Sequence, residues 1–285
     1  MSFVLIKTSE DLKYLDKELV KKPFVAVDTE FIRTSKKNMR LALIQVRDLE
    51  ETFIIDCIEV GKYKGECSFL FSSDVSKIFH SCREDLEAIF SWTYSVTNNI
   101  FDTQLANEFL GGSFSIGYQD LVFQRLGVKV NKGETRSNWL KRPLRDAQLD
   151  YAASDVEFLI DLFLSQKEEL KLSKKLDWLL EETSLMGDKL LLIEQESAVY
   201  ENRFKKHKFS KPEEKFLKKS LNEIIKMASK EEKINPTMLL SKKNQDIFLN
   251  NVIRDGLDNS IQGLSKWRRK ILSDQINLLF LGLQA

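Results

Sequence analysis

The stretch FVAVDTEF, residues 24–31, decides the fold. It alternates in character and is rich in Val and Phe, which predicts a β-strand. Two stretches of similar character follow, RLALIQVRD from Arg40 and TFIIDCI from Thr52. Polar residues around 35–38 separate the first two stretches, and the turn-like residues 48–51 separate the second pair. The sequence therefore predicts a meander of three neighbouring antiparallel strands.

After these strands the pattern changes to alternating strands and helices. A short strand, KIFHS from Lys77, runs into the helical pattern EDLEAIFSW from Glu84. A second short strand at residues 100–101 runs into DTQLANEFLGG, where Asp102 is placed to cap a helix and Gly111 to end it. Three strands followed by alternating strand and helix indicate a mixed α/β domain with a central sheet.

The domain organisation follows from the rest of the chain. A longer helical pattern starts near Asp146 and closes the first domain, and beyond about Leu172 every stretch is helical in character. We expect an α/β domain over residues 1–170, a connecting helix over 171–195 and a smaller all-α domain over 196–285.

Composition limits the possible chemistry. Apolar residues make up 42% of the chain, yet no apolar run approaches the roughly 20 residues of a membrane span, so we expect no membrane contact. The N-terminus lacks the order of a signal peptide, and the expected location is the cytoplasm. The three cysteines form no CxxC pair, and two histidines are too few for most zinc sites or for a Ser-His-Asp site. A metal site in this chain must therefore consist of oxygen ligands.

Charge is divided unevenly along the chain. Residues 171–285 carry 22 Lys and Arg against 16 Asp and Glu, whereas residues 1–170 carry 22 against 27. An acidic half that holds cations, joined to a basic half that attracts a polyanion, is consistent with this asymmetry.

The carboxylates of the first strand suggest a metal site. Asp28 and Glu30 are two residues apart, so their side chains project from the same face of the sheet. Two acids side by side on an apolar strand repel one another, and a bound divalent cation offsets that cost. The pair equally fits a strand that ends at the protein surface.

Two later positions supply further candidates. Tyr151 and Asp155 are four residues apart within YAASD, which places them on one face of a helix. Asp85, in HSCREDLEAIF, stands where an acidic residue commonly begins a helix. Each of these residues also has an ordinary structural reading as an exposed helical pair or a first-turn charge.

The ordered set of motifs is much more specific than its parts. DTEF, HSCREDLE, FDTQLA and RPLxxAQLDYAASD, in that order over residues 20–165, resemble the ribonuclease D family of DEDD exonucleases, in the subgroup with a tyrosine (DEDDy). The resemblance implies a ribonuclease H-like mixed sheet flanked by helices. It also implies that Asp28, Glu30, Asp85 and Asp155 bind two divalent cations, Mg²⁺ or Mn²⁺, and that Tyr151 positions the attacking water.

The tail extends the resemblance. INPTMLLSKKNQDIF and GLSKWRRKIL are similar to the end of the helical HRDC-type domain of that family, although residues 171–285 have room for one such domain where members can carry two. Asn138, in RSNWL, replaces an aspartate that is common in the family, and we expect this change to be tolerated because the position is not a ligand.

The resemblance implies a 3′→5′ exoribonuclease that releases nucleoside 5′-monophosphates. Its expected substrates are RNA 3′ ends, such as those of transfer RNA precursors or structured RNA, and no obligate protein partner is inferred. Two alternatives remain open: a DNA exonuclease of the same subgroup, and an RNA-binding protein with an inactive nuclease fold.

A basic segment, RFKKHKFSKPEEKFLKK from Arg203, holds eight Lys and Arg against two Glu. Its candidate RNA-binding residues are Arg203, Lys205, Lys206 and Lys208. A solvated lysine-rich helix explains the segment equally well.

Four other residues are assigned structural roles. We expect His80 to make a packing or hydrogen-bond contact, Asp102 to cap its helix, Glu87 to be solvated and Trp267 to pack the last helix.

Overall fold

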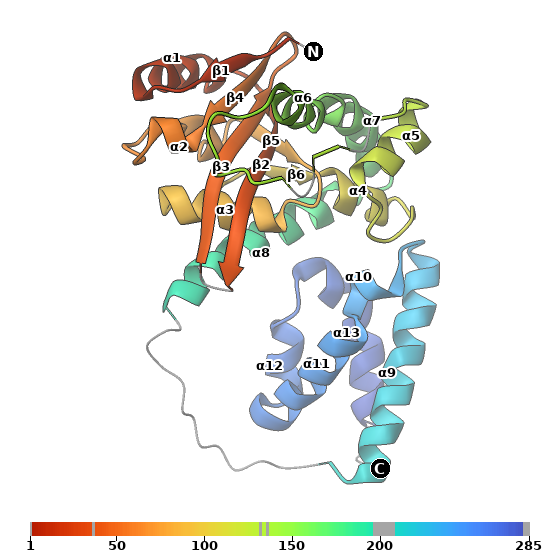
Figure 1. Cartoon of the computed structure of the whole chain (residues 1–285). Coiled ribbons are helices and arrows are strands. Elements are labelled where there is room, and N and C mark those ends of the chain that lie inside the picture. Colours follow the sequence, from red (N-terminus) through yellow and green to blue (C-terminus); the bar gives the residue numbers. More distant parts are fainter. Residues whose placement is uncertain (1, 36–37, 131–132, 135–136, 196–208, 282–285) are drawn as a thin grey trace. The chain divides into compact units, whose positions relative to one another are not determined.

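A mixed β-sheet forms the centre of the first part of the chain (Figure 1). The structure is a computed structural model that describes residues 2–35, 38–130, 133–134, 137–195 and 209–281. Within these residues the sheet has six strands in the order β1-β4-β3-β2-β5-β6. The strands are β1 (Val4–Ile6), β2 (Phe24–Ser35), β3 (Asn38–Arg47), β4 (Thr52–Asp56), β5 (Ser76–Phe79) and β6 (Ile100–Asp102).

The strand pairing confirms the predicted meander. β2 pairs antiparallel with β3, and β3 pairs antiparallel with β4. β5 pairs parallel with β2, β6 pairs parallel with β5, and β1 adds a parallel edge next to β4. The sheet is therefore mixed, as the change from adjacent strands to strand–helix alternation predicts.

Helices cover the sheet and continue the first part of the chain. They are α1 (Ser9–Leu19), α2 (Cys57–Val60), α3 (Arg83–Thr93), α4 (Thr103–Phe109), α5 (Tyr118–Leu126), α6 (Asp146–Ser154), α7 (Leu159–Leu172) and α8 (Leu176–Gln195), with a 3-10 turn η1 at Ser68–Leu70. α3 packs on β2 and β3, whereas α6 packs on β4 and α7 on β2 and β5.

Alternation along β2 gives its two faces different environments. Val25 and Val27 belong to a buried cluster that also contains Leu86 and Ile89 of α3. Ala26, Asp28 and Glu30, at the alternate positions of β2, face the opposite side of the sheet, because successive side chains of a strand point to opposite faces. On that side the buried cluster of β3, β4 and α6 includes Leu43, Ile54, Trp139, Ala152 and Ala153.

The long helix predicted from Asp146 onward is interrupted. α6 ends at Ser154 and α7 begins at Leu159, so Asp155 lies at the end of α6 in a short break instead of inside one continuous helix. The apolar stripe runs through both helices, and its period therefore gave no sign of the break.

The chain divides into two compact units. Unit 1 comprises residues 1–107 and 115–197, and unit 2 comprises residues 108–114 and 198–285. α8 belongs to unit 1, where it packs against α3, α7 and β6.

Unit 2 is helical throughout its described elements. These are α9 (Lys211–Glu231), α10 (Pro236–Leu240), α11 (Lys242–Asp255), α12 (Leu257–Gln262) and α13 (Lys266–Leu281). α9 begins with a capping box in which the Ser210 hydroxyl accepts from Glu213 N at 3.4 Å and the Glu213 carboxylate accepts from Ser210 N at 2.7 Å. Trp267 of α13 is 3% exposed and its ring lies 5.3 Å from that of Phe109, which confirms its predicted packing role. No helix among the described residues has the length and apolar character needed to span a membrane.

Candidate metal centre

Two of the candidate carboxylates lie on the face of β2 that looks toward α6. In the β2–β3 register Asp28 is opposite Gln45 and Glu30 is opposite Leu43. Leu43 packs in the cluster that contains α6, and directly opposite residues of an antiparallel pair share one face. The register shifts directly after Glu30, and such irregularities commonly redirect side chains beside active sites.

The third carboxylate is placed by the break between α6 and α7. The Tyr118 hydroxyl donates to Ser154 O at 3.1 Å and accepts from Phe158 N at 3.0 Å. These two bonds bracket the break on both sides of Asp155. The start of α5 therefore holds the turn that carries this carboxylate.

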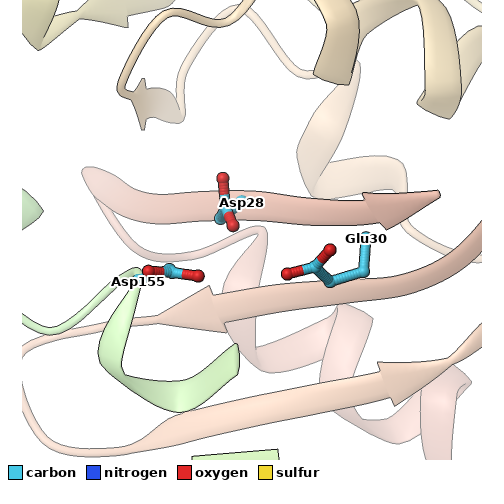
Figure 2. Close-up of side chains that lie close together, drawn as sticks. All are labelled: Asp28, Glu30 and Asp155. Atoms are coloured by element: carbon cyan, nitrogen blue, oxygen red, sulfur yellow. The ribbon is translucent and has the colours of Figure 1, made fainter. Parts of the chain in front are cut away.

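The three side chains converge although Asp155 is far from the other two in the sequence. Figure 2 shows the carboxylates of Asp28, Glu30 and Asp155 pointing toward one another from β2 and from the end of α6. One oxygen from each lies within 4.8 Å of one oxygen from each of the others. This spacing suits three ligands of a common cation.

Asp85 lies beside this group but is not part of the close set of three. It stands in the first turn of α3, is 7% exposed, and accepts a hydrogen bond from Thr29 Oγ1 at 2.6 Å. Burial is the main cause of the raised pKa of Glu30 and of Asp85; the charge of Asp85 adds to the rise at Glu30, and the charge of Asp28 adds to the rise at Asp85. Thr29, which lies between Asp28 and Glu30 in β2, thus connects this strand to α3 through its hydrogen bond with Asp85.

Burial and mutual repulsion dominate the electrostatics of the site. Burial raises the pKa of Asp28 to about 7. Burial, followed by the charges of the other three acids, raises the pKa of Glu30 to about 10, and burial with the charge of Asp28 raises the pKa of Asp155 to about 8. Burial likewise raises the pKa of Asp85 well above its usual value. A divalent cation relieves this repulsion, and its preference for oxygen ligands matches an all-carboxylate set.

Tyr151 adjoins the same carboxylates from α6. Burial and then the charges of Asp155, Glu30 and Asp28 raise the pKa of its hydroxyl, and hydrogen bonding to Tyr151 lowers the pKa of Asp155. The phenol therefore stays protonated near neutral pH and keeps its capacity to donate a hydrogen bond. Tyr151 lies in α6 and Asp155 caps its end, with Asp155 N bonded to Tyr151 O at 3.3 Å, so the two side chains reach one site as their spacing predicts.

Asp102 acts as the expected helix cap and also organises a second segment. Its Oδ1 accepts from the backbone N–H groups of Gln104 and Leu105 at 2.9 and 3.0 Å. Its carboxylate also accepts from Ser81 N at 3.1 Å and Cys82 N at 2.8 Å. Asp102 thereby fixes the turn that leads into α3 and Asp85.

His80 has the structural role that the sequence predicts, whereas the expectation for Glu87 is wrong. The two ring nitrogens of His80 contact Thr103 Oγ1 at 2.9 Å and Ile116 O at 3.0 Å. Glu87 was expected to be solvated, but it is 25% exposed and pairs with Arg33 Nη2 at 2.5 Å. The partner comes from β2, which the local helical pattern does not reveal.

The sequence did not single out two neighbours of Tyr151. The Trp139 ring centroid lies 6.2 Å from that of Tyr151, with 33° between the ring planes. A Cβ added to Gly133 would lie 2.7 Å from Tyr151 Cδ2, so the backbone passes directly against this ring. The apolar pair Trp139 and Leu140 in the otherwise polar segment 131–142 was the available signal.

The candidate RNA-binding residues of the basic segment, Arg203, Lys205, Lys206 and Lys208, lie outside the described residues.

Comparison with known proteins relates the chain to nucleases. Residues 3–171 match the family model described as 3′-5′ exonuclease. Ribonuclease D of Shewanella sp. (strain ANA-3) is 34% identical over 186 residues, which is 65% of this chain and 48% of that protein. Ribonuclease D of Haemophilus influenzae is 41% identical over 149 residues, which is 52% of this chain and 37% of that protein. The chain spans about half the length of the curated relatives it matches.

Solved structures share the fold. Escherichia coli RNase D superposes with a TM-score of 0.63 at 24% identity, covering 100% of this chain and 76% of that one. Brucella melitensis NrnC with bound Mg²⁺ gives a TM-score of 0.60 at 21% identity, covering 73% of this chain and 100% of that one.

These likenesses confirm the predicted ribonuclease H-like mixed sheet, followed by a helical unit consistent with an HRDC-like domain. The family model covers more than half of the chain and includes all four candidate carboxylates and Tyr151. The chain belongs to the 3′-5′ exonuclease family.

Proposed function

We propose that this protein is a metal-dependent 3′→5′ exoribonuclease of the ribonuclease D type. The observation that carries the proposal is the convergence of Asp28, Glu30 and Asp155, with oxygens within 4.8 Å of one another. A close group of half-buried acids is costly because the charges repel one another, and cation binding is the simplest function that offsets this cost.

The carboxylates divide the work of holding cations. Asp28, Glu30 and Asp155 form the close ligand set, and Asp85 completes the site from α3. We propose two divalent cations, Mg²⁺ or Mn²⁺, because four carboxylates suit such a pair. When bound, these ions activate water and stabilise the leaving 3′ oxygen.

Tyr151 has the proposed role of positioning the attacking water. Its protonated hydroxyl lies beside Asp155 and Glu30, where it is placed to hold the water by a hydrogen bond. The water oxygen forms a bond to the phosphorus of the last phosphodiester, and the bond from phosphorus to the 3′ oxygen breaks. The water supplies a proton to the released 3′ oxygen through solvent, and a nucleoside 5′-monophosphate leaves.

RNA is the proposed substrate, with transfer RNA precursors or structured RNA as the expected natural targets. Support comes from the curated relatives, which are named ribonuclease D. The resemblance of the tail to an HRDC-type domain and the basic residues Arg203, Lys205, Lys206 and Lys208 favour a nucleic acid as partner.

The two alternatives make different predictions. A DNA exonuclease would use the same carboxylates and would prefer a DNA end. An inactive RNA-binding protein is less favoured, because all four carboxylates and the tyrosine are present.

The test uses matched RNA and DNA oligonucleotides of one sequence, labelled at either the 5′ or the 3′ end, with Mg²⁺ or Mn²⁺. The proposal predicts a ladder of shortening 5′-labelled RNA, immediate release of a labelled mononucleotide from 3′-labelled RNA, and arrest by a chelator. Faster shortening of DNA would favour the first alternative, and binding of RNA without shortening would favour the second.

Substitutions connect this activity to the site. Asp28→Asn and Asp155→Asn are expected to lower the rate by about 100-fold or more, because each removes a charged ligand worth several kcal/mol in the transition state. Asp161→Asn, an exposed position of α7, is the matched control and should retain wild-type activity. Near-wild-type activity of the first two variants, with a normal circular dichroism spectrum, would refute the assignment.

A further inference from the structure

Trp139 has a buried polar group for which no described residue supplies a hydrogen bond. The indole is 2% exposed and packs with Leu43 of β3 and with Ala152 and Ala153 of α6. Its Nε1 is buried and makes no hydrogen bond of normal geometry within the described residues. An unsatisfied buried donor costs about 1–3 kcal/mol, so its position calls for an explanation.

Glu30 offers one explanation. An indole N–H is a donor only and needs an acceptor. Glu30 lies opposite Leu43 in the β2–β3 register, and the indole packs in the cluster that contains Leu43, on that same face of the sheet. Glu30 is also one of the three closely grouped carboxylates. The unsatisfied donor therefore lies at the edge of the candidate metal centre.

The same indole contacts a second residue of the site. Its ring centroid lies 6.2 Å from the Tyr151 centroid, and the ring planes are inclined by 33°. Tyr151 is also confined by the backbone at Gly133, where an added Cβ would be 2.7 Å from the ring. Trp139 thus contacts the candidate water-positioning residue and lies on the sheet face that carries Glu30, although it comes from the segment between α5 and α6.

We propose that Trp139 is a positioning residue with two separable actions: its N–H donates to Glu30 and orients that carboxylate toward a bound cation, while its ring holds Tyr151 in place. This inference rests on the proposed function for the identity of the site. Hydrogen bonds from outer residues fix the orientation of metal ligands, and their loss typically costs about 10-fold to 100-fold in metal affinity.

The first action is tested by Trp139→Phe, which keeps an aromatic ring and removes the N–H. The readout is the Mn²⁺ concentration at half-saturation in calorimetry and in thermal shift on the full chain, without substrate. We expect an increase of about 10-fold to 100-fold. The increase should be absent when Trp139→Phe is made in a Glu30→Gln background, because coupled residues have non-additive effects.

Trp92→Phe is the matched control. This substitution also removes an indole N–H, which in the wild type donates to Gly61 O at 2.9 Å. Trp92 packs against the cluster on the α3 side of the sheet. The Mn²⁺ concentration at half-saturation of Trp92→Phe should equal that of the wild type. Should Trp139→Phe not fold, replacement of Trp139 by benzothienylalanine, which exchanges only the N–H for sulfur, provides the same measurement.

The second action is tested by Trp139→Leu, which removes the ring. At saturating metal we expect kcat to fall by about tenfold with KM nearly unchanged, because misplaced catalytic groups lower the rate. In a Tyr151→Phe background the same substitution should have little further effect on kcat.

Several outcomes would overturn the inference. Wild-type Mn²⁺ affinity in the N–H-deleted variant would refute the first action, and an equal fall in kcat with and without the Tyr151 hydroxyl would refute the second. The metal titration needs no substrate. A wild-type chain that binds Mn²⁺ but degrades no RNA would therefore refute the proposed function and leave the first action of Trp139 testable.

Discussion

The Thr29 hydroxyl donates to Asp85 Oδ1 at 2.6 Å, which joins the strand of the first motif to the helix of the second. Thr29 lies between Asp28 and Glu30 on β2, and its side chain points to the opposite face. Its hydrogen bond lowers the pKa of Asp85 against the larger effect of burial. The residue between the two acids of the first motif therefore orients the acid of the second.

Thr29→Val should weaken metal binding without unfolding the protein. Valine has nearly the same shape but cannot donate, so Asp85 loses a bond to its buried carboxylate. We expect the Mg²⁺ concentration that gives half-maximal activity to rise by about 10-fold or more. Thr29→Ser, which keeps the hydroxyl, should behave as the wild type, and equal metal requirements of the two variants would contradict this role.

Tyr118→Phe should loosen the break that carries Asp155. The substitution removes the hydroxyl that donates to Ser154 O and accepts from Phe158 N. We expect a loss of about 1–3 kcal/mol in the free energy of unfolding, because two partly buried backbone groups lose their partner. The exonuclease activity of this variant should also fall when the metal concentration is below saturation. Tyr14→Phe, at a residue that is 73% exposed, is the matched control in denaturant titrations, and an equal stability of the two variants would argue against the clamp.

Local sequence pattern was sufficient to predict the central strands, but not the edge strand β1 or the break between α6 and α7. The apolar runs that form β2, β3 and β4 are long enough for their period to be read from sequence. β1 (Val4–Ile6) has three residues, too few to show a period. The break between α6 and α7 depends on Tyr118, a contact from a distant segment, while the apolar stripe continues through it.

The same distinction holds at the candidate site. The order of the motifs predicts which acids matter, and Asp28, Glu30 and Asp155 do converge. The neighbours that orient the site, Thr29 and Trp139, act through contacts between segments that no spacing rule connects. Tertiary contacts of this kind become visible only when the chain is folded.

Gly133→Ala should displace Tyr151. The added Cβ would lie 2.7 Å from Tyr151 Cδ2, a distance that forces the ring or the backbone to move. We expect kcat to fall by about 10-fold to 100-fold, because small misplacements of positioned groups have effects of this size. Gly117→Ala is the control, because a Cβ there meets nothing within 4 Å. Wild-type kcat in the Gly133 variant would show that the Tyr151 position is not critical.

Charge reversal in the basic segment should weaken RNA binding and its salt dependence. Lys205→Glu with Lys206→Glu removes two candidate phosphate contacts. For single-stranded RNA the slope of log affinity against log salt should become shallower by about 0.7 per lost contact. Lys62→Glu with Lys64→Glu, at two exposed positions of unit 1, changes the net charge equally and is the control. An unchanged slope in the first variant would identify the segment as a solvated lysine-rich stretch.

The stability of the metal-free protein should fall as pH rises, and divalent cations should reverse the fall. The pKa values of Asp28, Glu30 and Asp155 are raised to about 7, 10 and 8, above their usual 3.8, 4.5 and 3.8. An acid whose pKa is raised on folding holds its proton more tightly in the folded state. Its contribution to the free energy of unfolding is therefore full below the pKa of the unfolded chain and is lost as pH rises through the pKa of the folded protein.

With a chelator present, we therefore expect the ionisation of these three acids to lower Tm progressively from about pH 5 to pH 9. Added Mg²⁺ or Mn²⁺ should raise Tm by an increment that grows over the same range, because the metal binds the ionised carboxylates. Asp28→Asn should flatten both trends, since it removes one ionisation and its repulsion on Glu30 and Asp155. Differential scanning calorimetry with and without metal measures both quantities, and a metal increment that shrinks with rising pH would contradict a carboxylate-held cation.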